Sequence, residues 1–456
     1  MSSIDQYLQS QAQRFEEELC QLLRIPSVSA DPDYRDDVCR AADWVAEQFR
    51  RLGFSTEVIP TPGHPLVYAE SPPVAKATTV LVYGHYDVQP ADPLDEWISP
   101  PFEPTRRGGN LYARGATDDK GQMLTHVKSA EAWLATEGGL PLNLKFLIEG
   151  EEEVGSHGLE QFIAQHARRL TCDCVVISDG AQFSPGQPAI TYGLRGIACY
   201  ELRLTGPDRD LHSGSFGGTV TNPANALARM LAALVDDWGK IQIPGFYDDV
   251  LPLSDRECRE LAALEFDEQK YLGQIGVEGT TGEAGYTLLQ RRWARPTCDV
   301  NGLSSGYQGK GAKTIIPAAA GAKLSFRLVP DQDPQKVTAG LKQRLADVCP
   351  PGIRWELSDL HGSQAVLVPL DSRYVEAAAR AVEQAFGRRP VFTREGGSIP
   401  IVAVFHQTLK VDTLLLGWGQ DDDNPHSPNE KFSLADFHRG IQASARLWEE
   451  LSKMAR

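Results

Sequence analysis

A run of glutamates directly after a buried strand constrains this chain more than any other feature of its sequence. A strand is predicted over 142–148, where most side chains are apolar, and Pro141 and Gly150 bound it. Four carboxylates then follow within five positions: Glu149, Glu151, Glu152 and Glu153. Because like charges at this spacing repel, and because ligand sites in open α/β sheets lie at the carboxyl ends of strands, we expect a metal ion among them. A solvated acidic loop is the alternative that a charge run leaves open.

Other predicted strands and loops supply groups of the same chemical kind. They are His85 with Asp87 after the strand at 78–83, Asp179 after the strand at 174–178, and Asp118 and His426 in Gly- and Pro-rich loops. Zinc takes imidazole nitrogen and carboxylate oxygen, and two ions that share a carboxylate need about five protein ligands. Taken singly, His85 fits a core histidine, Asp179 a helix cap and His426 a loop residue. Their convergence on strand ends favours one site.

The order of elements predicts two domains, one of them split. The 456 residues exceed one ordinary domain. Helix and strand alternate through 1–193, which predicts an α/β domain with a mainly parallel sheet and helices on both faces. The pattern over 194–362 indicates an inserted α+β domain with an antiparallel sheet, although 239–292 has no clean period. Residues 363–456 are expected to complete the first domain.

Composition excludes several classes of function. The formal net charge of −16 argues against nucleic-acid and anionic-membrane partners. No signal peptide is visible at the N-terminus, and no apolar run approaches the ~18 residues of a membrane span. The eight cysteines form no C-x-x-C pair. Cys172 and Cys174 are expected to alternate across one strand, and free thiols in a cytoplasmic protein are the simplest interpretation.

Seven segments together resemble a known family. They are GHYDVQP at 84–90, RGATDDKG at 114–121, EGEEEVGS at 149–156, SD at 178–179, DLHSG at 210–214, GAKTIIP at 311–317 and HSPNEK at 426–431. Their order is that of the dinuclear-zinc metallopeptidases related to aminoacylase, glutamate carboxypeptidase and carnosinase. The last three segments are most similar to the carnosinase and cytosolic nonspecific dipeptidase branch. The resemblance spans nearly the whole chain.

The resemblance implies two divalent metal ions per subunit, zinc preferred and manganese the alternative. Asp118 would bridge them. His85 and Asp179 would complete one site, and Glu153 and His426 the other. Glu152 would be the general base for the metal-bound water. Asp87 would orient the His85 ring, and the peptide bond after Asp118 would be cis.

The resemblance also implies a substrate layer and a homodimer. The inserted domain resembles the lid of the family, which makes the dimer contact. His212 would reach the active site of the partner subunit and polarise the scissile carbonyl, with Thr314 beside it. Arg327 and His361 would bind the free carboxylate of a dipeptide, and Glu395 and Ser398 the rest of it. Arg195 and Arg394 are weaker candidates for the carboxylate clamp.

These assignments imply a metal-dependent, carboxypeptidase-like dipeptidase that uses a metal-bound hydroxide and a glutamate general base. An N-acyl amino acid deacylase of the acetylornithine or succinyl-diaminopimelate type would share the metal ligands. A non-catalytic, metal-stabilised binding protein is a second rival, against which an intact Glu152 argues. A serine hydrolase is a third, because Ser304 stands in a G-x-S-x-G segment. The residues after it would not hold the helix that a nucleophile elbow opens.

Overall fold

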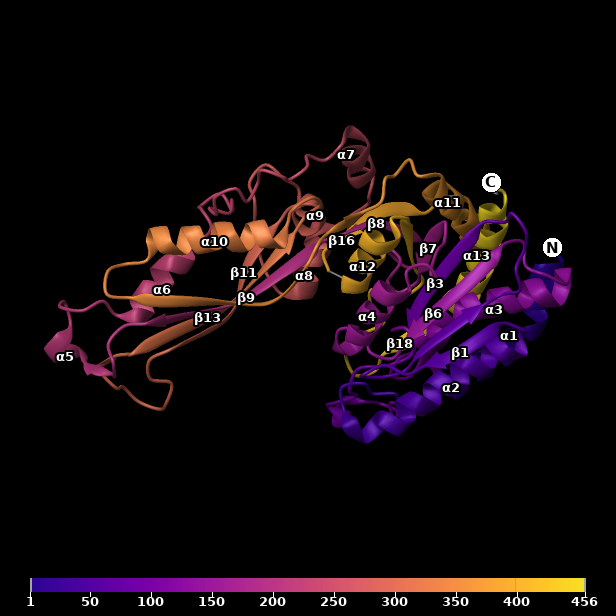
Figure 1. Ribbon diagram of the computed structural model, residues 1–456, viewed down its shortest axis with the longest axis horizontal. Helices are drawn as coiled ribbons and strands as arrows, with labels where there is room; N and C mark the ends of the chain where they lie inside the picture. The colour runs from indigo at the N-terminus through magenta and orange to yellow at the C-terminus, as the bar shows by residue number, and fades with distance from the viewer. Residues whose placement is uncertain (1, 398, 455–456) are drawn as a thin grey trace. The chain divides into compact units, whose positions relative to one another are not determined.

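The computed structural model describes residues 2–397 and 399–454 and divides into two compact units (Figure 1). The first unit comprises Met1–Tyr192, Val368–Thr393 and Val404–Arg456. The second comprises Gly193–Leu367 and Arg394–Ala403. The second unit therefore interrupts the first in sequence.

The larger sheet has a parallel centre. Its order is β1 (Ser55–Ile59), β2 (Leu66–Glu70), β6 (Asn143–Glu149), β3 (Thr79–His85), β7 (Cys174–Ile177), β17 (Asp412–Gly417), β8 (Ala189–Leu194) and β15 (Val366–Leu367), with β16 (Val391–Glu395) paired to β8. Strands β6, β3, β7 and β17 run parallel, and antiparallel pairs flank them. Every residue of β7 is buried, which is the pattern of a parallel strand covered on both faces. The predicted α/β class is confirmed.

Helices pack on both faces of this sheet. They are α1 (Ser3–Leu23), α2 (Arg35–Arg51), α3 (Lys120–Glu137), α4 (His157–His166), α11 (Arg373–Phe386), α12 (Pro400–Leu409) and α13 (Leu434–Ser452), with short 3-10 turns η1 (Pro32–Tyr34), η2 (Leu94–Glu96) and η3 (Glu152–Val154). Phe49 of α2 lies 4.6 Å, centroid to centroid, from Phe146 of β6. Tyr83 of β3 pairs with Leu147, the residue after Phe146 on β6, so its side chain points to the other face of the sheet. There its ring lies 5.6 Å, centroid to centroid, from Phe405 of α12.

Buried polar contacts fasten α13 to α3 and to the end of β7. His126 of α3 contacts the hydroxyls of Ser444, at 3.0 Å, and Ser178, at 2.9 Å. Burial lowers the pKa of His126 to about 3, so the imidazole is neutral and can donate through one nitrogen and accept through the other. The indole of Trp448 donates to Ser129 at 2.8 Å. Ser178, the residue before Asp179, is therefore held by the helix layer.

The second unit is an antiparallel sheet with helices packed on one face. The sheet order is β11 (Thr297–Ser305), β13 (Ala319–Leu328), β9 (Gly196–Thr205) and β14 (Arg354–Ser363), and a short ribbon pairs β10 (Leu211–His212) with β12 (Ile315–Ile316). The helices are α5 (Ser213–Phe216), α6 (Pro223–Ala232), α7 (Asp255–Ala262), α8 (Glu268–Ile275), α9 (Leu288–Trp293) and α10 (Pro334–Val348). Alternate residues of β9 and β13 are buried with α6 and α10, for example Tyr200 and Phe326. This strict alternation is typical of an antiparallel sheet with one covered face.

Some local details differ from the simplest interpretation of the sequence. The segment 210–218 is polar and Gly-rich, which is typical of a loop, yet it contains β10 and α5, because the 211–212 backbone finds a partner in β12. Strand β7 begins at Cys174, so Cys172 precedes it and does not alternate with Cys174 along the strand. Strand β11 runs to Ser305, so Ser304 lies inside a strand rather than at a strand-to-helix turn. This excludes a nucleophile elbow at Ser304.

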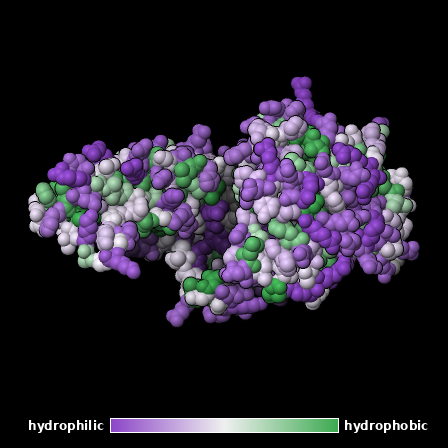
Figure 2. Space-filling view, turned by 90° about the horizontal axis from the view of Figure 1, so that it is seen from below, coloured by the Kyte–Doolittle hydropathy of each residue, from purple (hydrophilic) through white to green (hydrophobic). Residues whose placement is uncertain are grey.

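One face of the molecule is shown in Figure 2. Hydrophilic side chains cover most of it, and hydrophobic ones form small groups. All eight cysteines are free thiols. Among the residues described, no helix combines the length and apolar character that crossing a bilayer requires. A small sheet of β18 (Lys431–Ser433), β5 (Asn110–Tyr112) and β4 (Thr105–Arg107) completes the first unit.

Candidate metal centre

Three adjacent parallel strands bring their carboxyl ends to one edge of the large sheet. Strand β3 lies between β6 and β7, and all three run in the same direction. His85 ends β3, the glutamate turn follows β6, and Asp179 follows β7 by two residues. The predicted convergence of these side chains is therefore a direct result of strand order.

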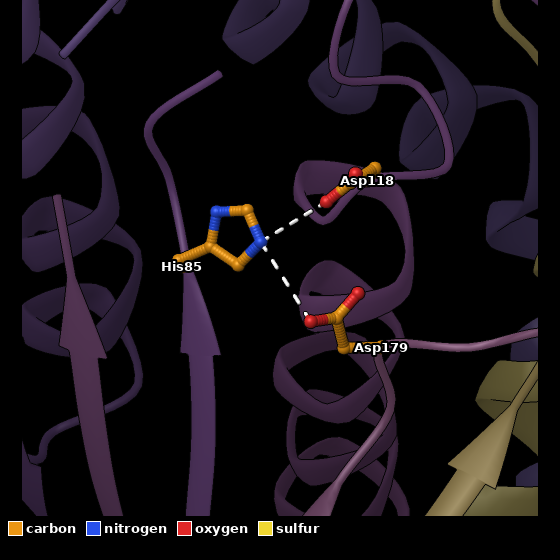
Figure 3. Close-up of side chains that lie close together, drawn as sticks. All are labelled: His85, Asp118 and Asp179. Carbon is orange, nitrogen blue, oxygen red and sulfur yellow. Dashed lines mark ion pairs between the residues drawn. The ribbon is translucent and has the colours of Figure 1, made fainter. Parts of the chain in front are cut away.

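His85, Asp118 and Asp179 form the first cluster. Nε2 of His85 lies 3.1 Å from Oδ1 of Asp118 and 3.9 Å from Oδ2 of Asp179. Figure 3 shows the imidazole at the end of its strand with this nitrogen directed at both carboxylates. His85 is fully buried. One potential ligand atom from each residue lies within 4.8 Å of the others.

Asp118, Glu153 and His426 form the second cluster, and Asp118 is common to both. Nε2 of His426 lies 3.0 Å from Oδ2 of Asp118 and 3.2 Å from Oε2 of Glu153. Gln89 donates to the same Glu153 oxygen at 2.7 Å. The two oxygens of Asp118 thus face different histidines, one in each cluster. This is the arrangement that a carboxylate bridging two ions requires.

The crowding of carboxylates around two imidazoles shifts the pKa values of several residues in the two clusters. Burial opposes ionisation of Asp118, but the adjacent imidazoles of His426 and His85 outweigh it and hold its pKa well below the usual range. The carboxylates of Asp118 and Glu153 raise the pKa of His426 to about 10. Burial, together with the negative charge of Asp118, raises the pKa of Asp179 to about 7. Protons are therefore held where divalent cations would stabilise the same carboxylates.

The donor set fits a metal. Nε2 of His85 is buried and makes no well-aligned hydrogen bond, although two carboxylates lie near it. A buried imidazole nitrogen aimed at carboxylate oxygens is a ligand atom ready for a cation. Histidine and carboxylate ligands suit zinc and also manganese.

Asp87 connects the His85 ring to the glutamate turn. Its Oδ1 lies 3.3 Å from Nδ1 of His85, and its backbone carbonyl is 3.1 Å from the same nitrogen. Its carboxylate also accepts the backbone N–H groups of Glu152 at 3.3 Å and Glu153 at 3.2 Å. A proton on Nδ1 leaves Nε2 as the ligand atom. Asp87 therefore fixes both the tautomer of His85 and the position of the turn.

Glu152 lies outside both clusters, on the turn η3. Burial is the main cause that raises its pKa to about 8. The nearby His85 opposes the rise, and Asp179, Glu153 and Asp118 add to it. A carboxyl group whose pKa lies near neutrality, beside but not within a ligand set, can both take up and release a proton.

Glu430 is a functional residue whose role the sequence did not reveal. Its buried carboxylate accepts backbone N–H groups of Gly115 at 2.8 Å, Thr117 at 2.9 Å and Asp118 at 3.1 Å. It also pairs with Nη1 of Arg114 at 2.8 Å. Glu430 thus ties the loop that carries Asp118 to the loop that carries His426. Its place four residues after His426, inside the HSPNEK segment, was the available signal.

Asp119 and Lys120 hold the other side of the Asp118 loop. The Asp118–Asp119 peptide bond is cis, as predicted. Oδ2 of Asp119 accepts the backbone N–H of His85 at 3.2 Å. The buried Lys120 ammonium donates to the carbonyls of Leu22, at 3.3 Å, and Ile25, at 2.7 Å. The sequence offered no signal for these contacts, because they join segments far apart in the chain.

The second unit brings the other predicted residues together in pairs. His212 pairs with Ile315 in the β10–β12 ribbon. Thr314 directly precedes β12, and its carbonyl accepts the Ser213 N–H at 3.0 Å. Arg327 of β13 and His361 of β14 flank β9, opposite Ile197 and Cys199. Those two positions are two apart on the strand, so both side chains belong to the face opposite the apolar core.

The remaining candidate substrate-binding residues differ in their exposure and in their contacts. Glu395 ends β16 and is exposed, whereas Ser398 lies outside the described residues. Arg394 is buried in an ion pair with Glu257. Arg195 donates to the carbonyls of Gly396 at 3.0 Å and Arg295 at 3.3 Å.

Comparison with known proteins agrees with this architecture. The chain is 35% identical over 455 residues to the Cys-Gly metallodipeptidase dug1 of Schizosaccharomyces pombe, covering 96% of this chain and 95% of that one. It is 32% identical over 474 residues to the human Beta-Ala-His dipeptidase, covering 100% and 93%. The solved structure of the metallo-carboxypeptidase Sso-CP2 from Sulfolobus solfataricus is similar with a TM-score of 0.85 and 34% identity, covering 96% and 99%.

A family model described as Peptidase family M20/M25/M40 matches residues 81–450, a span that contains both clusters and the whole second unit. The fold, the paired imidazole–carboxylate clusters and this match lead to one conclusion: the chain belongs to the M20/M25/M40 peptidase family and is an enzyme of the metallopeptidase class.

Proposed function

We propose that this protein hydrolyses the peptide bond of dipeptides with two divalent metal ions. His85 and Asp179 would hold one ion, Glu153 and His426 would hold the other, and Asp118 would be shared by both. The observation that carries this assignment is the orientation of Asp118, whose Oδ1 lies 3.1 Å from His85 and Oδ2 3.0 Å from His426. Zinc is the preferred metal, because imidazole and carboxylate are its usual ligands in catalytic sites.

Glu152 moves the proton in this mechanism. When bound, the two ions supply Lewis acidity and lower the pKa of a water molecule to about 7. Glu152 would accept a proton from the attacking water and deliver it to the leaving amine, because it lies on the turn beside the two clusters and belongs to neither. Asp87 holds the backbone of Glu152 and Glu153 in place, so that base and ligand keep their separate positions.

The second unit supplies the substrate contacts. Arg327 and His361 bind the free carboxylate, for which the planar fork of arginine is suited. His212 and the neighbouring Thr314 act on the scissile carbonyl in the partner subunit, where an imidazole donor stabilises developing oxyanion charge. Glu395 and Ser398 contact the rest of the dipeptide. The relatives named for Cys-Gly and Beta-Ala-His dipeptides support a dipeptide substrate over an N-acyl amino acid.

A homodimer through the second unit follows from this shared site. Strand β11 is an edge strand, and Val300 and Leu303 on it are 46% and 67% exposed. An exposed apolar edge strand of this kind is suited to pairing with a second copy. The free thiols of the eight cysteines are consistent with a cytoplasmic enzyme.

The substrate assignment is tested by a substrate panel. The purified, zinc-loaded protein is expected to hydrolyse dipeptides with a free carboxylate and to leave the matching N-acetyl amino acids largely intact. Release of amino acids is measured by chromatography, with dipeptide amides as the control for the carboxylate clamp. Preferential hydrolysis of N-acetyl amino acids would instead establish the deacylase.

The shared-site dimer is tested by complementation. Glu152→Gln and His212→Ala are each expected to lose about 10²-fold or more in turnover, the scale of a general base or an oxyanion donor. When the two are co-expressed, half of the dimers are mixed, and one of their two sites is intact. Turnover is therefore expected to recover to about a quarter of the wild-type value.

The matched control is co-expression of Glu152→Gln with Glu153→Gln, which leaves no intact centre in any dimer. It is expected to show no recovery. Equal inactivity of the Glu152→Gln and His212→Ala mixture would mean that His212 acts within its own chain, and the shared site would be rejected.

Glu430→Gln is expected to weaken metal retention by about 10- to 100-fold, the usual effect of losing a group that orients a ligand. Both oxygens of Glu430 accept hydrogen bonds, from Arg114 and from backbone N–H groups of the Asp118 loop. In glutamine one oxygen is replaced by an NH2 group, which donates and would face these donors. Zinc affinity is measured by competition with a chromophoric chelator. Asp422→Asn, which removes an exposed partner of Lys431, is the control and should bind zinc normally. Unchanged affinity in Glu430→Gln would contradict the tie between the two loops.

A further inference from the structure

The second unit contains a recess of about 450 Å³ that the proposed reaction does not use. Its walls come from helices α8 and α9, the start of β11 and the intervening 276–283 segment. The described residues that line the recess do not include the proposed substrate contacts His212, Thr314, Arg327 and His361. The volume is that of a site for a small ligand.

Positive charge dominates the polar wall of the recess. Four arginines line it, namely Arg195, Arg291, Arg292 and Arg295, together with the carboxylates of Glu283 and Asp299. Arg295 is neutralised by Glu283 through two parallel contacts, of 2.7 and 2.8 Å. Three guanidinium groups therefore share the recess with one further carboxylate. In a chain with a net charge of −16, this is a local reversal of sign.

The guanidinium groups of this recess repel one another, although Arg195 and Arg291 also donate to nearby carbonyl groups. Arg195 is half-buried, and desolvation followed by repulsion from Arg327 lowers its pKa to about 10, with Arg292 contributing in the same direction. Asp299 opposes the shift. An anion bound between these groups would relieve both the repulsion and the lost hydration.

Another part of the wall is apolar and partly open. Leu272 is buried, but Ile275 and Val277 are 54% and 45% exposed. Arg292 is exposed and also lines the recess, with its guanidinium carbon 5.6 Å from the centroid of the Tyr271 ring. A ligand that covers this wall must therefore carry an apolar body as well as a charge.

We propose that this recess binds a small amphipathic anion, in which a phosphate or carboxylate group is attached to an aromatic or aliphatic body. The oxyanion pairs with the guanidinium of Arg292 and with the neighbouring arginines. The apolar body packs against Ile275 and Val277. Arginine suits both kinds of oxyanion, because its fork pairs with two oxygens at once.

The test uses zinc-loaded, full-length protein and calorimetric titration with phenyl phosphate and with phenylacetate. At least one is expected to bind with a dissociation constant of about 1 mM or lower. Arg292→Gln is expected to weaken that binding about tenfold, because one charge-assisted hydrogen-bonding partner is removed. Arg259→Gln, an exposed arginine on a helix of the same unit, is the matched control and should bind as the wild type does.

A second variant separates the two walls. Val277→Asn is expected to weaken phenyl phosphate several-fold while leaving the weaker affinity for inorganic phosphate unchanged. The relative affinities of phenyl phosphate and phenylacetate decide between a phosphate and a carboxylate ligand. Absence of binding by both probes at about 1 mM would overturn the proposal. Binding that is unchanged in Arg292→Gln would overturn it too, because the anion would then sit elsewhere, such as at the metal centre.

Discussion

The carboxylate of Asp118 connects the two clusters of the candidate metal centre. Asp118 faces His85 through Oδ1 and His426 through Oδ2, at 3.1 and 3.0 Å. A carboxylate with a histidine on each side, and with Asp179 and Glu153 completing the two clusters, concentrates negative charge in a buried place. Such a centre is stable only with compensating positive charge, supplied by protons on the histidines or by metal ions.

The surrounding contacts keep this arrangement from relaxing. Asp87 orients His85 and clamps the glutamate turn, and Glu430 gathers the backbone of the Asp118 loop. His126 fixes Ser178, directly before Asp179, through the helix layer. Buried groups thus fix the loops and strand ends that carry His85, Asp118, Glu153 and Asp179. Preorganisation of this kind lets ions bind without paying for the ordering of the site.

Much of this arrangement was predictable, for identifiable reasons. The buried strands ending at His85 and before Asp179 are short apolar runs, and parallel strands place their ends at one edge, so the convergence of these side chains followed from the sequence. The division of the ligands between two ions came from the family resemblance. The role of Glu430 did not, because its partners are backbone amides more than 300 positions away along the chain. Strand β10 was not predicted, because the 210–218 sequence is polar and Gly-rich and its backbone becomes a strand only by pairing with β12. The arginine recess was missed because the 239–292 segment has no clean period.

The most direct test of the shared carboxylate is a crystal structure of the zinc-loaded protein, with anomalous diffraction data collected on both sides of the zinc absorption edge. Two anomalous peaks are expected in each chain. One should lie among His85, Asp118 and Asp179, and the other among Asp118, Glu153 and His426. A single peak, or two peaks of which only one contacts Asp118, would contradict the account.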